Sequence, residues 1–162
     1  MKKEVDIDEI RGRFGNGICC AMSVFGDLAP MLGLDAETAR SIASGFCGHY
    51  EHNNFCGCVS GAKMALGMKY GPRKLGDNDK AVVLKQKIRE FEEQFATEFG
   101  STHCPEILGG LDPSVQEDRP KIIELDLFHT TCVNAVCFAE ELLQDMLEDE
   151  EGELFPRRRP GI

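Results

Sequence analysis

Apolar side chains recur at intervals of three or four residues along the longest regular segment of this chain. The residues that carry this stripe are Leu84, Ile88, Phe91, Phe95 and Phe99. This spacing gathers them on one face of an α-helix, and the apolar face must be covered by other parts of the fold. We expect a helix over 79–99 that ends at Gly100.

The other periodic segments are also predicted to be helical. Their expected ranges are 18–32, 36–45, 59–70, 105–109 and 122–148. Residues 45–57 contain Gly and Asn without helical periodicity, which predicts a loop. The inner face of the last helix would carry Cys132, Val136, Ala139, Leu143 and Met146. With no strand pattern in the sequence, we predict an all-α fold, a compact bundle of about five to six helices with a glycine-rich cysteine loop.

The chain is long enough for one domain. Its 162 residues, 42% of them hydrophobic, can form one substantial core. We place a single helical domain at 1–148. Residues 149–162 follow as an acidic and then Arg- and Pro-rich tail, which we expect to be extended.

The formal net charge is −10, and the sequence has neither a basic stripe nor any Trp. We therefore do not expect nucleic-acid binding. The charged N-terminal residues are unlike a secretion signal, and no uninterrupted apolar run approaches the length of a membrane span. These features predict a cytoplasmic protein that does not enter membranes.

Eight residues of the chain are cysteines. Because a reducing cytosol disfavours permanent disulfides, this number indicates metal binding or reversible redox chemistry rather than a disulfide framework. Four cysteines lie at or near the starts of different helical segments, namely Cys20, Cys56, Cys104 and Cys132. Unpaired N–H groups and the positive end of the helix dipole stabilise thiolates at such positions. We expect these four residues to share one site.

Helical geometry separates the four from other cysteines. Cys132 lies on the inner face of its helix, whereas Cys137 is rotated from it by about 140°. Cys20 shares the apolar face of its helix, and Cys19 is rotated from it by about 100°. Free cysteine is often a small apolar filler. We expect such a packing role, or incidental exposure, for Cys19, Cys47 and Cys137.

Several stretches of the chain form an ordered set of short motifs. They are 20–24, 32–35, 37–39, 44–46, 56–62, 66–71, 99–104, and Cys132 with Val136 and 140–142. This set, spread over about residues 16–146, resembles the C-GCAxxG-C-C family of redox-active proteins. The resemblance implies a redox role, and the four cysteines of the family's motif fall on Cys20, Cys56, Cys104 and Cys132.

The chain departs from the family pattern at Cys58, where members usually carry Ala. Cys58 is therefore a candidate fifth ligand or a resolving thiol. Cys19, Cys47 and Cys137 also lie outside the usual set of cysteines.

Three kinds of function remain open. The first is an iron–sulfur cluster on the four cysteines for electron transfer or redox sensing, because such clusters are held by thiolates. The second is a thiol–disulfide oxidoreductase without metal, in which Cys56 pairs with Cys58 or Cys104. The third is a zinc-stapled interaction protein, although structural zinc favours Cys-x-x-Cys pairs, which the sequence lacks. A redox role requires a partner protein that the sequence does not identify, and the apolar stripes are compatible with a homodimer.

Two histidines lie beside motif cysteines. His129 precedes Cys132 by three residues, and His103 directly precedes Cys104, so each could hydrogen-bond a thiolate or bind metal. A structural role for both is the simpler interpretation. The pair at 49 and 52 has metal-like spacing only in a helix, which the surrounding glycines disfavour.

Overall fold

The structure is a computed structural model and describes residues 2–148. Its elements, with short 3-10 turns labelled η, are α1 Ile7–Arg13, α2 Cys20–Leu28, η1 Ala29–Leu32, α3 Ala36–Ala43, η2 Ser44–Phe46, α4 Gly57–Tyr70, α5 Asn78–Phe99, α6 Cys104–Ile107, α7 Arg119–Glu124 and α8 Thr131–Leu147. Within the described range there is no strand beyond one isolated bridge between Phe55 and His103. The prediction of an all-α fold is confirmed, with eight α-helices in this range instead of five to six. The predicted tail at 149–162 lies outside the described residues.

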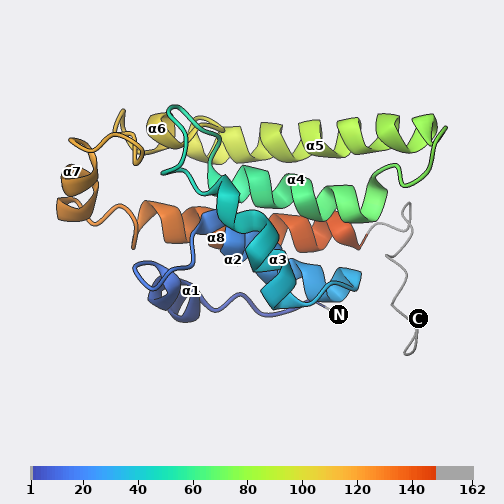
Figure 1. The fold of residues 1–162 in the computed structure, drawn as a ribbon, viewed down its shortest axis with the longest axis horizontal. Coiled ribbons are helices and arrows are strands. Elements are labelled where there is room, and N and C mark those ends of the chain that lie inside the picture. Colours follow the sequence, from blue (N-terminus) through green and yellow to red (C-terminus); the bar gives the residue numbers. More distant parts are fainter. Residues whose placement is uncertain (1, 149–162) are drawn as a thin grey trace.

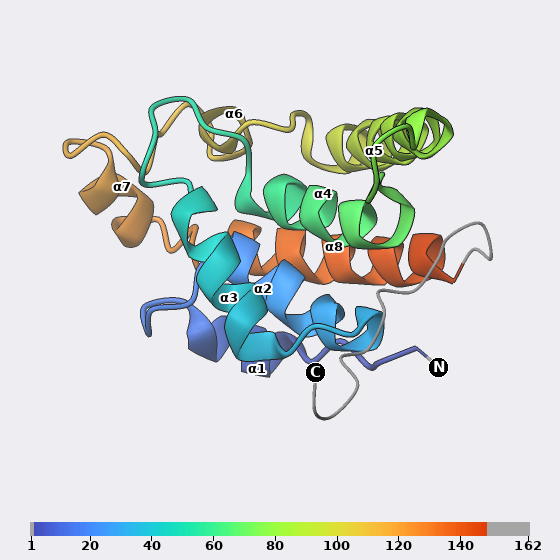
Figure 2. The same ribbon diagram turned by 45° about the vertical axis from the view of Figure 1, so that its right-hand side comes forward.

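Three long helices form the body of the molecule. Helices α4 and α8 run in the same direction, and α5 runs antiparallel to both (Figure 1). Helix α2 packs against α3, α4 and α8, while α1 packs on α8 (Figure 2). The chain therefore places the starts of α2, α4 and α8 toward one end of the bundle. None of the helices in the described range is long and apolar enough to cross a membrane.

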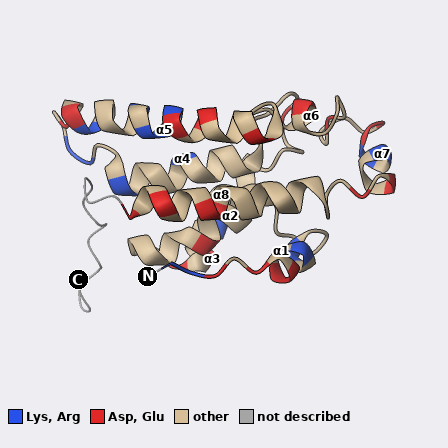
Figure 3. Cartoon of the chain, turned by 180° about the vertical axis from the view of Figure 1, so that it is seen from behind, with Lys and Arg blue, Asp and Glu red and all other residues tan. Residues whose placement is uncertain are grey.

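The apolar stripe of α5 faces the core as predicted. Phe91 and Phe95 are fully buried, and the other three stripe residues pack against the core from its edge. Acidic and basic residues recur along this helix (Figure 3). On α8, all five residues of the predicted inner face are buried. Helical periodicity was sufficient to identify both faces because each helix has one clear apolar side.

The helix predicted over 122–148 is wrong in its first part. Helix α7 ends at Glu124, and Asp126 adopts a positive φ of 55° that interrupts the helix. The chain resumes as α8 at Thr131. Cys132 is consequently the second residue of a helix, where the end effects of the helix dipole are strongest.

The predicted helices also differ from the structure near the N-terminus. The segment predicted over 18–32 leaves α-helical geometry after Leu28 and continues as η1, so Met31 points outward and is 42% exposed. Helix α1 was not predicted. It begins after Asp6, whose carboxylate accepts hydrogen bonds from the backbone N–H groups of Asp8 and Glu9.

A buried polar contact joins three helices. Arg13 of α1 donates a hydrogen bond of 2.7 Å to Asp27 of α2. Glu140 of α8 is only 4% exposed, and burial together with its hydrogen bond to Asp27 raises the pKa of Glu140 to about 10. Burial opposes ionisation of Asp27, but hydrogen bonds from Glu140 and Arg13 outweigh it and lower the pKa of Asp27. Glu140 is thus the protonated member of the carboxyl pair at neutral pH.

We predict that this pair makes stability depend on pH. Because the folded protein holds a proton on Glu140 that the unfolded chain releases above about pH 4.5, the contribution of Glu140 to the free energy of unfolding falls as pH rises toward about 10. The slope is at most about 1.4 kcal/mol per pH unit. Asp27, Arg13 and Lys3 surround the group, and the lowered pKa of Asp27 affects stability only at acidic pH.

Urea denaturation between about pH 6 and pH 9 measures this slope. Relative to the wild-type protein, Glu140→Gln should make the slope more positive by at most about 1.4 kcal/mol per pH unit, whereas Glu141→Gln, at the exposed neighbouring position, should leave the wild-type slope unchanged. Equal slopes in the wild-type protein and Glu140→Gln would show that the pair does not hold this proton.

Candidate thiol site

The four motif cysteines gather at one end of the helical bundle. Cys20 is the first residue of α2, Cys56 is the N-cap of α4, Cys104 is the first residue of α6 and Cys132 is the second residue of α8. Cys56 and Cys132 are buried, while Cys20 and Cys104 are partly buried. The predicted placement near helix starts is confirmed, and their common role in binding a cofactor stays a prediction.

A short backbone pairing holds Cys56 beside Cys104. The N–H of Cys56 donates to the carbonyl oxygen of Thr102 at 2.8 Å, and the N–H of Cys104 donates to that of Asn54 at 2.9 Å. These bonds flank the bridge between Phe55 and His103, whose rings stack with centroids 4.5 Å apart. Two segments far apart in sequence thus present their cysteines side by side.

Close packing of α4 on α2 places Cys20 in the same cluster. A Cβ atom at Gly57 would lie 2.7 Å from the backbone nitrogen of Ala21 and 2.8 Å from Cβ of Cys20. One at Gly61 would lie 3.0 Å from the carbonyl oxygen of Ala21. Only glycine allows this approach without movement of the α2 backbone.

The cysteine sulfurs interact directly. Hydrogen bonds from the thiols of Cys132 and Cys58 lower the pKa of Cys20 well below its usual value, despite the opposing effect of burial. The hydrogen bond to Cys20, and then burial, raise the pKa of Cys132. Burial raises the pKa of Cys104, and negative charge on Cys56 and Cys20 adds to this effect. Cys20 is therefore favoured as a thiolate, whereas ionisation of Cys104 and Cys132 is disfavoured.

Cys58 belongs to the same cluster. It is fully buried in the first turn of α4, and burial with hydrogen bonds to Cys20 and Cys56 raises its pKa well above the usual value. The sequence left open whether this residue faces the site. In the structure its thiol contacts two of the four motif cysteines.

The remaining cysteines lie elsewhere. Cys19 and Cys47 form a disulfide with their Cα atoms 5.9 Å apart, so the expectation that both are packing residues is wrong. No pattern in the sequence predicts this pairing, because the two residues are 28 positions apart and Cys47 lies in an irregular loop. Cys137 is partly buried on α8, and burial raises its pKa. No interaction of Cys137 with the five clustered thiols is found among the described residues.

The histidines beside motif cysteines have other partners. His129 contacts the carboxylate of Asp126 through Nδ1 at 3.0 Å and the carbonyl oxygen of Phe14 through Nε2 at 3.3 Å. His103 stacks on Phe55. His52 contacts Asp112 at 3.1 Å, within an irregular loop. These contacts agree with a structural role for the histidines.

The residues gathered at this site supply sulfur donors. Within residues 2–148, no group of three or more His, Cys, Asp or Glu side chains has the geometry to hold one metal ion. The clustered groups are all thiols, which is the usual ligand set of iron–sulfur clusters.

The family model described as "Putative redox-active protein (C_GCAxxG_C_C)" matches residues 18–146, and the chain belongs to this family. No match is found among curated proteins or among solved structures. The resemblance inferred from the ordered motifs is confirmed, and with it the redox-active character of the family.

We predict that Gly57→Ala disturbs the thiol site, because its added methyl group would collide with α2 at Cys20. The strain should lower the free energy of unfolding by about 1–3 kcal/mol and increase the rate at which Cys20 is alkylated in the folded protein. Gly67→Ala on the same helix is the matched control, since nothing lies within 4 Å of its added Cβ. The close-packing interpretation fails if the two variants behave alike in denaturation and alkylation.

Proposed function

Because the chain belongs to this redox-active family, we propose that Cys20, Cys56, Cys104 and Cys132 hold an iron–sulfur cluster used for electron transfer or redox sensing. The observation that carries the proposal is the convergence of four cysteines from four separate segments at one end of the bundle. Packing alone does not require thiols at each of these positions, since Ala or Val would fill similar space.

Electrostatics supports a cationic cofactor at this point. Four neighbouring thiolates repel one another, as the mutual charge interactions of Cys104 and Cys132 with the other thiols indicate. Iron would supply the positive charge that makes simultaneous ionisation favourable. The starts of α2, α4 and α8 also contribute positive ends of helix dipoles. A bound cluster would accept and release single electrons.

The protein surroundings would tune the potential of such a cofactor. Burial of Cys56 and Cys132 limits contact with water, and low solvent exposure is one determinant of cluster potential. Cys58 would act beside the ligands as a hydrogen-bonding thiol toward Cys20 and Cys56. We assign it this positioning role instead of that of a fifth ligand.

Thiol–disulfide exchange without metal is the second candidate function. The contact of Cys20 with the thiols of Cys132 and Cys58 favours it. Two of these thiols would join as a disulfide, while a disulfide substrate takes up their two electrons and two protons and becomes two thiols.

Structural zinc is less well supported, because it favours Cys-x-x-Cys pairs. Either redox role implies a partner protein, and a homodimer stays open to a test by light scattering.

We predict that protein purified anaerobically contains iron and acid-labile sulfide and absorbs broadly at visible wavelengths. Serine at position 20, 56, 104 or 132 should remove nearly all of the iron, because each replacement deletes one ligand. Cys137→Ser should retain the wild-type iron content, since Cys137 lies outside the cluster of thiols. Iron and sulfide analysis with absorption spectroscopy provides the readout.

Cys58→Ala separates a positioning thiol from a ligand. We expect this variant to keep its iron but to shift its reduction potential, because one hydrogen bond near the ligands is lost. A colourless wild-type protein that contains zinc, or no metal together with a reversible disulfide among the clustered thiols, would refute the cluster proposal.

A further inference from the structure

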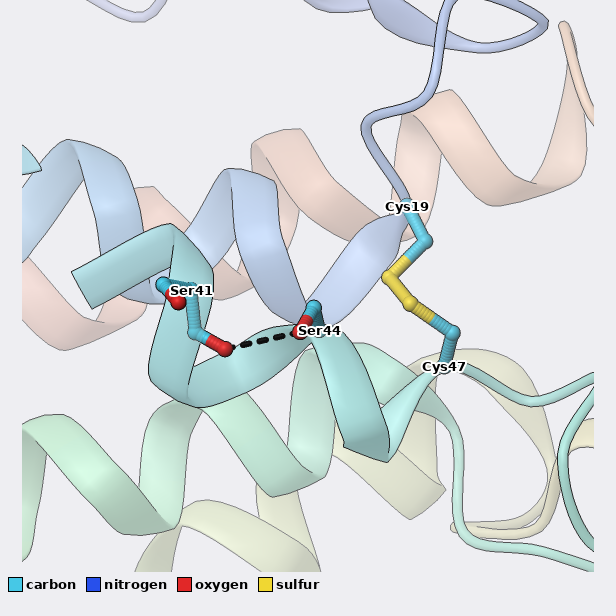
Figure 4. The surroundings of a disulfide bond; sticks show 4 residues. All are labelled: Cys19, Ser41, Ser44 and Cys47. Carbon is cyan, nitrogen blue, oxygen red and sulfur yellow. Dashed lines mark hydrogen bonds between the residues drawn. A yellow bond between two sulfur atoms is a disulfide. The ribbon is translucent and has the colours of Figure 1, made fainter. Parts of the chain in front are cut away.

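The Cys19–Cys47 disulfide connects two segments that border the thiol site. Cys19 is the N-cap of α2, and Cys47 directly follows η2 (Figure 4). Figure 4 shows the bond bridging the start of α2 and the end of the α3–η2 segment. Neither residue belongs to the four motif cysteines.

Each end of the disulfide is one residue away from a contact with the site. Cys19 directly precedes Cys20. Cys47 directly precedes Gly48, where an added Cβ would lie 3.1 Å from Sγ of Cys104. The backbone at Gly48 therefore covers the Cys104 sulfur. Opening the disulfide would loosen the backbone at Gly48 and so expose the Cys104 sulfur.

The segment between Cys47 and Asn53, which we call the covering loop, is anchored differently at its two ends. On its far side, the N–H of Asn53 donates to the carboxylate of Asp112 at 2.8 Å, and the carbonyl oxygen of Asn54 accepts from Cys104. On its near side, the disulfide ties Cys47 to the start of α2. Between these anchors the residues are largely exposed, and Tyr50 is 62% exposed. Loss of the disulfide leaves the loop held mainly from the far side.

From this placement we infer that Cys19 and Cys47 form a second redox site, a reversible dithiol–disulfide pair whose reduction by a dithiol uncovers the Cys104 side of the thiol site. The inference does not depend on what the four motif cysteines bind. Its substrate class is a dithiol reductant able to reach the edge of the molecule where Cys19 is only partly buried.

The exchange proceeds in two steps. A thiolate of the dithiol attacks Sγ of Cys19, the bond between the two protein sulfurs breaks, and Cys47 leaves as a thiolate that takes up a proton. The second thiol of the reductant then attacks the mixed disulfide and releases Cys19, which also becomes a thiol. The reductant ends as a disulfide, having given two electrons and two protons to the cysteine pair.

Peptide mapping after acid quenching and alkylation tests the pair itself. Oxidised protein should yield one linked peptide that joins Cys19 to Cys47. Mixtures of reduced and oxidised dithiothreitol should open and reclose this bond in folded protein, in a single two-electron transition. The inference is overturned if both cysteines are alkylated in oxidised protein, or if the bond resists excess dithiothreitol until the protein unfolds.

Hydrogen–deuterium exchange tests the effect on the covering loop. We expect reduction to accelerate exchange of residues 46–52 at least about tenfold, while α8 is unchanged. Cys19→Ser should show the fast exchange without reductant, and Cys137→Ser should respond as the wild type does. Unchanged exchange of 46–52 after complete reduction contradicts the covering role. Iron content is measured separately, so the reversible disulfide and the iron–sulfur cluster can each be refuted without the other.

Discussion

The close approach of α2 and α4 is the constraint on which the thiol site depends. At Gly57 and Gly61 the two helices come so near that any side chain would meet the backbone of Ala21. This contact sets Cys20 against Cys58, which also hydrogen-bonds Cys56. The bridge between Phe55 and His103 then adds Cys104, and the start of α8 adds Cys132. Cysteines distant in the sequence are brought together by helix packing and one short backbone pairing.

A group of adjacent buried thiols is unfavourable when more than one of them is ionised. The structure shows the compromise, with Cys20 favoured as a thiolate while the pKa values of its neighbours Cys58 and Cys132 are raised. A cation, a covalent sulfur–sulfur bond or retained protons can each resolve this conflict. The proposed cluster is the first solution. The Cys19–Cys47 disulfide lies beside the site and involves none of the five clustered thiols.

Sequence reasoning succeeded where one helix face decides the outcome. The stripe of α5 and the inner face of α8 were predicted from spacing, and motif order identified the family. Sequence reasoning failed where contacts between distant segments determine the structure. The positive φ of Asp126 breaks the last predicted helix, and the partner of Cys47 depends on how α3 returns to α2. Spacing within one segment contains no information about either.

The central claim is that the four motif cysteines act as one ligand set. Alkylation mass spectrometry of anaerobically purified protein, before and after treatment with acid and chelator under denaturing conditions, tests it most directly. We expect Cys20, Cys56, Cys104 and Cys132 to be protected as a group before the treatment and to be labelled together after it. Cys137, which is partly buried away from the site, should be labelled in both states. Labelling of the four at unrelated rates, unchanged by removal of bound iron, would contradict the account.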